Sequence, residues 1–393
     1  MKLSKRKIKL VFLGWTATLY LLFLYSFTQI DLNLTLSRVS VWQKLEKAFV
    51  YLGYFQRPTS AVIYLTIIFL LFVFYGLILW LARKGRLQMN QLRRLIGLTV
   101  LILFLAYPAF SHDIFNYIFD AKIVAYYHQN PYQVKPLDFP DDPMTRFMHW
   151  THRPSIYPPL WIGLSTIPFV FGFGKFIFQL IAFKVMMAGF YLGTIWLIFK
   201  TSEVLGPRQK IFNIAFYAFN PLVIIESLVS AHNDGIMAFF FLLAFFFILA
   251  KKPVYSLLSW LFSIGVKYVT VIFLPIFFLL AWQKLQAKKI NWQRLVTLTV
   301  GLGAVGILII TYRIGFQPWY LLWVLPFLAI KKDNQFLTWV TVGLSLGSLL
   351  RYTPFLYLGN WDPPVPTIKL WLFWLPVGLS LAISLLGRKV VRQ

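Results

Sequence analysis

The chain contains no cysteine and has few charged residues. The missing thiols exclude a disulfide framework, a thiolate metal site and a cysteine nucleophile, and they leave the redox compartment undetermined. Charged side chains make up 13% of the 393 residues, about half the share in a soluble domain. Hydrophobic residues make up 59%, and apolar runs of about 20 residues recur from end to end. The sequence therefore predicts an all-α integral membrane protein that crosses the membrane many times.

Basic residues are abundant, but they lie between the apolar runs. A net charge of +26 would suit a nucleic-acid partner only if these residues shared a soluble face, so we exclude nucleic acid. By the positive-inside rule the basic clusters are cytoplasmic. They hold 24 of the 38 Lys and Arg residues, whereas only Glu203 and Asp333 of the 12 acids lie within or directly beside them, which places most acids on the outer side. The clusters are 2–9, 83–86, 93–94, 200–210, 251–252, 284–294, 331–332 and 388–392.

The apolar runs predict twelve spans, with both termini in the cytoplasm. The run 158–172 is interrupted by Pro168 and is too short to span comfortably, so we expect a re-entrant or partial helix there. If this run did cross, there would be thirteen spans. With no soluble domain visible, residues 1–393 form a single transmembrane domain. The twelve runs are 8–30, 59–82, 94–110, 175–200, 210–227, 234–250, 254–267, 268–283, 294–313, 318–330, 335–350 and 367–387.

The longest hydrophilic segment is the outer loop 111–157. Its first part, 112–128, predicts an amphipathic helix that lies along the membrane interface. Polar residues recur there at three- to four-residue spacing on one face, namely Asp113, Asn116, Tyr117 and Asp120. The second part is rich in proline, which favours an extended path folded over a cavity.

The other unusual polar groups also lie on the outer side of this topology, which indicates one outward-facing polar cavity. Carboxylates near histidine and several cations suit a reaction in which a base removes a hydroxyl proton while cations hold a departing phosphate. This is the chemistry of glycosyl transfer from a lipid phosphate. The groups are Asp113, Asp120, Glu226, His232, Asn233, Asp234, Lys267, Arg313, Gln317, Trp319, Tyr320, Arg351 and Asp362.

Each group also has a purely structural interpretation. Asp113 could cap the loop helix, and Asn233 or Asp234 could cap the next span. Lys267, at the tip of a short hairpin formed by 254–283, could extend to lipid headgroups, and Trp319 and Tyr320 could belong to an aromatic belt. Metal binding is indicated only weakly, because the available ligands have no fixed spacing. These ligands are His112, Asp113, His232 and Asp234.

Several motifs between about residues 95 and 330 are informative through their order and spacing. They are Ser111 to Tyr117, Asn130-Pro131-Tyr132, Ile156 to Trp161, Asn220 to Glu226, His232-Asn233-Asp234, Gly265 to Lys267 with Leu274-Pro275, and Gln317 to Trp323.

Together these motifs resemble the GT-C superfamily of polyprenyl-phosphate-sugar-dependent glycosyltransferases. They are similar in particular to those of bacterial mannosyltransferases that use polyprenyl-phospho-mannose. The resemblance implies a GT-C helical bundle and an inverting transferase with its site on the extracytoplasmic face of the cytoplasmic membrane. It also implies a lipid-linked or cell-envelope acceptor and no metal or other cofactor.

Carried over by position, the resemblance makes Asp113 the catalytic base. Many GT-C enzymes place paired acids in the first outer loop, whereas here a single aspartate follows the third span, so Asp120 and Asp234 stay alternatives. Cations for the donor phosphate are Lys267, Arg313, Arg351 and His232. Contacts to the sugar or the acceptor are assigned to His112, Asn116, Tyr117, Asn233, Trp319 and Tyr320.

Three other classes of membrane protein fit parts of this pattern. A polytopic transporter or lipid flippase also buries charge, but such proteins tend to carry inverted repeats, and none is visible here. A polymerase or ligase of envelope polysaccharide would share the chemistry and commonly has a large outer loop rich in Arg and His. A scaffold without catalytic activity would not need acids and cations around one cavity. The sequence does not identify the sugar, the acceptor or the oligomeric state.

Overall fold

The structure is a computed structural model that describes residues 5–286, 288–332 and 334–390. The regular elements within these ranges are all helices, as the composition predicts. Five helices are long and apolar enough to cross a membrane, and each coincides with a predicted run. They are α1 (Lys5–Ser26), α3 (Arg57–Arg83), α7 (Phe176–Leu205), α13 (Trp292–Ile314) and α17 (Val365–Val390).

The other predicted runs also contain helices, but these are shorter. A helix of 16 residues is about 24 Å long, less than the roughly 30 Å of a hydrocarbon core. The prediction of twelve or thirteen spans is therefore not confirmed by length and remains a prediction. The shorter helices are α4 (Met89–Leu103), α10 (Asp234–Leu249), α11 (Pro253–Val266), η7 (Tyr268–Phe273) with α12 (Leu274–Leu285), η8 (Pro318–Trp323) with α14 (Leu325–Ile330), and α15 (Gln335–Leu350).

A sixth helical segment of spanning length is broken in its middle. The chain bends by 53° between α8 (Lys210–Ala218) and α9 (Pro221–Ile224), which continues as the π-helical turn η6 (Ile225–Val229). Pro221 has no N–H with which to continue α8, and the side chain of Asn220 accepts a hydrogen bond from Leu222 N at 3.0 Å. Every residue from 212 to 234 is buried, so this broken segment forms the centre of the bundle.

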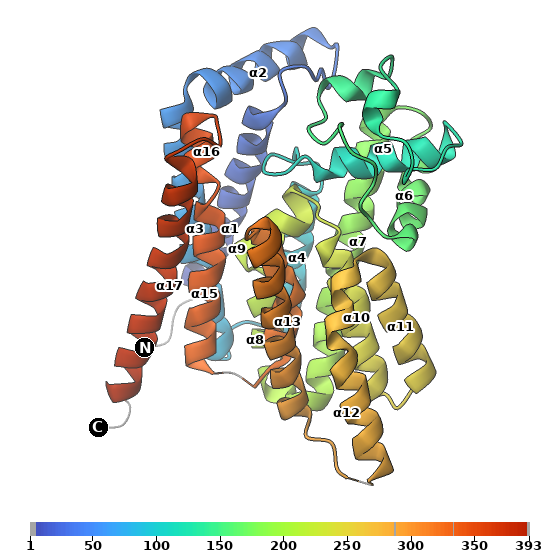
Figure 1. The fold of residues 1–393 in the computed structure, drawn as a ribbon. Helices are drawn as coiled ribbons and strands as arrows, with labels where there is room; N and C mark the ends of the chain where they lie inside the picture. Colours follow the sequence, from blue (N-terminus) through green and yellow to red (C-terminus); the bar gives the residue numbers. More distant parts are fainter. Residues whose placement is uncertain (1–4, 287, 333, 391–393) are drawn as a thin grey trace.

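Figure 1 shows α2 (Ser40–Val50), α5 (Asp113–Ala125) and α6 (Pro159–Phe171) gathered at one end of the molecule. The loop 126–157 lies at this same end, between α5 and α6. The start of α1 and the end of α17 lie toward the opposite end. The predicted loop is therefore separated from the start of α1 and the end of α17 along the length of the bundle.

Helix α5 confirms the expected helix in 112–128, and its position along the membrane interface stays a prediction. The residues from Ile114 to Ala121 and Ile123 are all buried. The apolar face packs into the bundle, and the polar face is covered by the returning loop at 150–155. The exposed helix at this end is α2, in which no residue is buried and which the sequence analysis did not predict.

Candidate active site

Asp113 is the first residue of α5 and presents its carboxylate at the edge of a buried polar cluster. The side chain keeps 19% of its surface exposed, so a substrate could reach it. The start of a helix favours an anion because the first N–H groups of the helix have no partner within it. Downstream on the same face, Tyr117 OH donates to Asn233 Oδ1 at 3.3 Å. The face of α5 that begins with Asp113 therefore meets the segment 232–234.

His232 lies between two carboxylates. Its Nδ1 is 3.5 Å from Asp113 Oδ2, and its Nε2 is 3.4 Å from Glu226 Oε2. These distances suit ion pairs but are longer than ordinary hydrogen bonds. The ring of Trp319 stacks on the imidazole at 3.9 Å between centroids and 21° between planes. Stacking and burial leave the imidazole little freedom to turn away from Asp113.

Glu226 is fully buried in η6 and is held from two sides. Tyr352 OH donates to Glu226 Oε1 at 2.9 Å, and His232 faces the other oxygen. The buried Lys184 of α7 donates to the carbonyl oxygens of Leu228 and Val229, the latter at 2.8 Å, and so satisfies carbonyls that the end of this turn leaves open. The turn places Glu226 beside His232 instead of facing lipid.

The chain between η6 and His232 passes through a strained residue. Ala231 has φ of 60°, a left-handed conformation that alanine rarely adopts, and it is completely buried. Such strain persists only where surrounding contacts fix the backbone, and it is common at functional sites. Here it permits the sharp turn that directs His232 toward Asp113.

Lys267 forms an ion pair with Asp234 on the other side of this cluster. Lys267 has extended backbone angles, with φ −156° and ψ 122°, and so separates α11 from η7. Its Nζ lies 2.8 Å from both oxygens of Asp234, the first residue of α10. Trp323 Nε1 donates to the same carboxylate at 2.6 Å. Asp234 is thereby occupied by two donors, which argues against it as the alternative base.

Burial and nearby charges shift the pKa values of three ionisable groups in α5 or directly before it. Burial alone would raise the pKa of Asp113, but His232, Lys267 and Arg153 outweigh it and hold that pKa below its usual value. Burial raises the pKa of Asp120 to about 7, although Ser155 Oγ donates to it at 2.7 Å. Burial disfavours the charged form of His112 as well, and because that form is the protonated one, its pKa is lowered to about 4. Asp113 is thus the acid of α5 that stays ionised most readily.

The structure brings most of the predicted site residues together. Asp120 and Asn116 lie on the same face of α5 but are bonded to the loop, with Asn116 Nδ2 donating to Trp150 O at 3.0 Å. Arg351 lies one residue before Tyr352, and its Nη2 donates to Phe316 O at 3.0 Å. Those assembled around the buried cluster are Asp113, Tyr117, His232, Asn233, Asp234, Lys267, Trp319 and Tyr320.

Arg313 and His112 do not join this cluster. Arg313 was expected to bind the donor phosphate, but it is exposed near the end of α13 and forms no ion pair among the described residues. His112 was expected to contact sugar, but its imidazole lies instead against that of His149 at 4.0 Å between ring centroids. His149 and Asp31 complete a group with His112 that could hold a metal ion.

Three residues that shape the site, Tyr352, Lys184 and Arg153, were not among the predicted site residues, and Glu226 was placed in the predicted cavity without a specific role. A lysine inside a span is a usable signal for Lys184. Tyr352 and Arg153 carry no such signal, because a tyrosine and a surface arginine are ordinary where they stand in the sequence.

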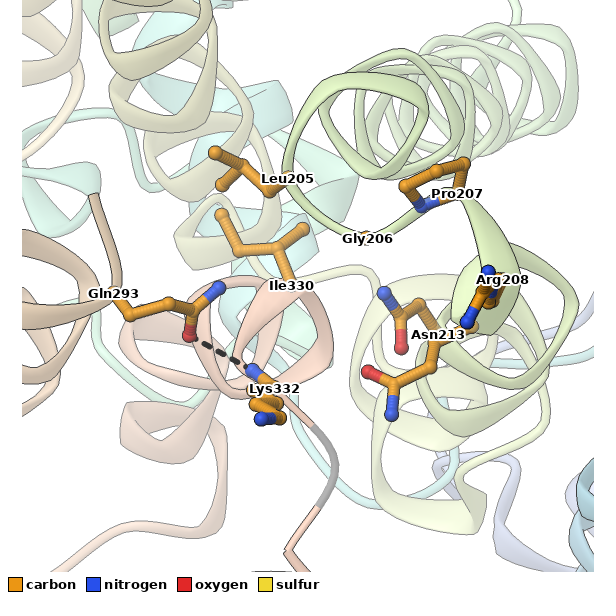
Figure 2. A pocket seen from close by; sticks show the side chains of 9 residues that line it. Leu205, Gly206, Pro207, Arg208, Asn213, Gln293, Ile330 and Lys332 are labelled. Carbon is orange, nitrogen blue, oxygen red and sulfur yellow. Dashed lines mark hydrogen bonds between the residues drawn. The ribbon is translucent and has the colours of Figure 1, made fainter. Parts of the chain in front are cut away.

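A cavity of ≈ 420 Å³ lies elsewhere in the bundle, as Figure 2 shows. It opens where α7 ends and α8 begins, and Lys332 N donates to Gln293 Oε1 at its edge at 2.9 Å. Its cationic residues Arg208 and Lys332 belong to two of the basic clusters in the sequence. None of the residues that line this cavity belongs to the cluster around Asp113, so the cavity does not define the candidate active site.

The chain is similar to a known protein family. A family model described as alpha-(1->6)-mannopyranosyltransferase, N-terminal domain, matches residues 13–284. The matched part contains Asp113, Glu226, His232, Asp234 and Lys267. No curated protein and no solved structure matches the chain significantly. Three residues that contact this cluster lie beyond the matched part, namely Trp319, Trp323 and Tyr352.

Proposed function

The chain belongs to the alpha-(1->6)-mannopyranosyltransferase family and is a mannosyltransferase, and we propose that its mannosyl donor is a polyprenyl phosphate. The acceptor is a hydroxyl of a lipid-linked or cell-envelope glycan, and the transfer inverts the configuration at the anomeric carbon. The observation that carries this proposal is the position of Asp113, a partly exposed carboxylate that faces a buried histidine beside a lysine.

Asp113 is the proposed base. It accepts the proton of the acceptor hydroxyl as the oxygen of that hydroxyl attacks the anomeric carbon of mannose. The bond between that carbon and the phosphate oxygen breaks, and the polyprenyl phosphate leaves with the bonding electron pair. No covalent enzyme intermediate forms. One carboxylate is sufficient for this chemistry, which fits a site where Asp234 is occupied by Lys267 and Trp323.

His232 and Glu226 are positioning residues for Asp113. His232 faces the base with one nitrogen and the buried Glu226 with the other, so the two carboxylates hold the ring plane between them. A positive charge on His232 is balanced on both sides. The stacked Trp319 supports the same orientation. This arrangement keeps Asp113 at one place and one angle while the acceptor binds.

Cations at the edge of the cluster suit the departing phosphate. Lys267 keeps 25% of its side chain exposed while Asp234 holds its ammonium in place. Arg153 is exposed on the loop above α5 and acts electrostatically on Asp113. Both would stabilise charge that develops on the phosphate as the glycosidic bond breaks. Arg351 is a further candidate through its place beside Tyr352.

The proposed orientation puts α5 and the loop 126–157 on the extracytoplasmic side of the cytoplasmic membrane. In the sequence, the acids of this loop lie apart from the basic turns. In Figure 1, α5 lies at the other end of the molecule from the start of α1 and the end of α17. Both termini are then cytoplasmic. The transporter or flippase alternative gains no support from the fold or from the family.

The test is a transfer assay with purified protein in detergent. Radiolabelled polyprenyl-phosphate mannose, polyprenyl-phosphate glucose and a sugar nucleotide are each incubated with a lipid extract from membranes. We expect label to move from the polyprenyl-phosphate mannose into a lipid-soluble product, with an α-anomeric linkage from a β-linked donor. Transfer from the sugar nucleotide alone would overturn the proposed donor, and retention of the donor configuration would overturn the inverting mechanism.

A further inference from the structure

We propose that Asp31, His112 and His149 form a binding site for one divalent first-row transition metal ion such as Zn²⁺. One ligand atom from each residue lies within 4.8 Å of the others. The three residues come from different parts of the chain that meet beside the start of α5. Asp31 follows α1 and η1 (Phe27–Gln29), His112 immediately precedes α5, and His149 belongs to the returning loop. This proposal does not depend on the donor or mechanism proposed above.

The geometry brings two imidazoles and one carboxylate close together, with an ion-pair contact between His149 and Asp31 that is longer than an ordinary hydrogen bond. His149 Nε2 is 3.6 Å from Asp31 Oδ2, beyond an ordinary hydrogen bond. The two imidazoles lie 4.0 Å apart between centroids at 44°, so two protonated rings would repel each other there. His112 Nδ1 is buried and has no hydrogen-bond partner among the described residues. A buried ring nitrogen without a partner is costly, and a bound ion would satisfy it.

The carboxylate is already oriented for such a role. Asp31 Oδ1 accepts a hydrogen bond from Asn33 N at 2.9 Å, which leaves Oδ2 directed toward His149. Tyr107 OH accepts a hydrogen bond from Asp31 N at 3.3 Å and anchors the backbone at this point. Hydrogen bonds of this kind commonly fix the ligands of metal sites in position.

The ligand set selects the class of ion. Imidazole nitrogens suit zinc and its neighbours, whereas magnesium and calcium prefer oxygen ligands. A tetrahedral zinc ion with bonds of about 2.0–2.1 Å needs its ligand atoms about 3.3 Å apart. The exposed side chain of His149, at 55% of its surface, has the freedom to close the remaining distance. Three protein ligands leave a fourth position for water.

The ion would join the first outer loop, the start of α5 and the returning loop. His112 is the neighbour of Asp113, so the bound ion would fix the backbone directly before the proposed base. No metal was assigned from the sequence, where the weak candidate ligands were His112, Asp113, His232 and Asp234. Of these four, only His112 belongs to the group that the fold assembles. Its partners Asp31 and His149 are distant from it in the sequence, so no local pattern indicated them.

The test is metal binding by the full chain in detergent, after its purification tag is removed and the protein is treated with a chelator. Zn²⁺ binding is measured by calorimetry, and bound metal is counted by mass spectrometry. We expect one Zn²⁺ per chain and a loss of affinity of about 100-fold or more in His149→Ala. The matched control is His152→Ala, an exposed histidine of the same loop outside the group, which should bind Zn²⁺ like the unaltered protein.

Thermal unfolding separates loss of a ligand from loss of the fold. In the absence of metal, His149→Ala should unfold at the same temperature as the metal-free unaltered protein, because His149 is exposed and contributes little to packing. Added Zn²⁺ should raise the unfolding temperature of the unaltered protein and of His152→Ala but not that of His149→Ala. Absence of Zn²⁺ binding by the unaltered chain, or equal binding by His149→Ala, would overturn the proposed site.

Discussion

Lys267 and Asp234 form an ion pair in which the lysine Nζ lies 2.8 Å from both carboxylate oxygens. The two side chains differ in exposure, with 25% of Lys267 but none of Asp234 accessible to solvent. The pair fixes the break after α11 against the start of α10, and Trp323 joins it from η8. The sequence placed this lysine at a hairpin tip, and the fold supplies an anion for it from the same chain.

The unequal exposure predicts unequal effects on stability. Lys267→Gln leaves the buried Asp234 carboxylate with Trp323 as its remaining strong donor and should lower the free energy of unfolding by about 3–5 kcal/mol. Asp234→Asn should cost less, because the Lys267 ammonium can turn toward water. Chemical unfolding in detergent measures both.

The double variant Lys267→Gln with Asp234→Asn tests the same pair. It should recover part of the stability lost in Lys267→Gln, since the uncompensated charge is gone. Binding of the donor phosphate should not recover, because the cation is still missing. Equal destabilisation by the two single variants would contradict this account of the ion pair.

Asp113→Asn should lower the rate of mannosyl transfer by about 100-fold or more, because an amide cannot accept the acceptor proton. Donor binding and the unfolding temperature should change little, since the amide occupies the same space. The matched control is Asp141→Asn, which alters an exposed acid of the same loop and should retain full activity. Normal transfer by Asp113→Asn would exclude this residue as the base.

Tyr352→Phe should lower the free energy of unfolding by about 1–3 kcal/mol, because it removes a donor from the buried Glu226 and adds no replacement. The rate of transfer should fall while the KM for the donor stays close to its normal value, as expected if Glu226 acts through His232. Tyr357→Phe is the control, since Tyr357 is 52% exposed in the adjacent helix α16 (Thr353–Leu358). Identical effects of both substitutions on stability and rate would contradict a specific role for Tyr352.

The buried Asp120 should make stability fall as the pH rises. Its pKa is about 7 in the folded protein and near 3.8 when the chain is unfolded. Between these values the folded state keeps a proton that the unfolded state has released, so unfolding becomes easier as the pH increases from about 4 to about 7. Above that range the difference stays constant.

Asp120→Asn should remove this contribution, since an amide does not titrate and can still accept the hydrogen bond from Ser155. The measurement is the unfolding temperature of both proteins over this pH range. The gap between the variant and the unaltered protein should widen in favour of the variant as the pH rises. A constant gap would show that Asp120 does not change its protonation on unfolding.

The helical segments could be predicted from the sequence, because apolar runs bounded by basic residues are a local signal. The breaks within them were harder to predict. Asn220-Pro221 could be noted as a motif, but the 53° bend and the buried π-helical turn that presents Glu226 depend on packing by Lys184 and Tyr352. The burial of the polar face of α5 could not be predicted, because hydrophobic spacing cannot reveal that a distant loop covers that face.

Asp113, His232 and Lys267 were chosen from the sequence, since charge is rare in this chain and its position after apolar runs is informative by itself. Their partners were decided by the tertiary structure. Asp234 pairs with Lys267, Glu226 with His232 and Asp31 with His149, across separations that no local pattern records. The sequence alone thus determined a helical membrane protein and led to the proposal of Asp113 as the base. Only the fold decided which charges neutralise one another, because pairing depends on distances between segments far apart in the chain.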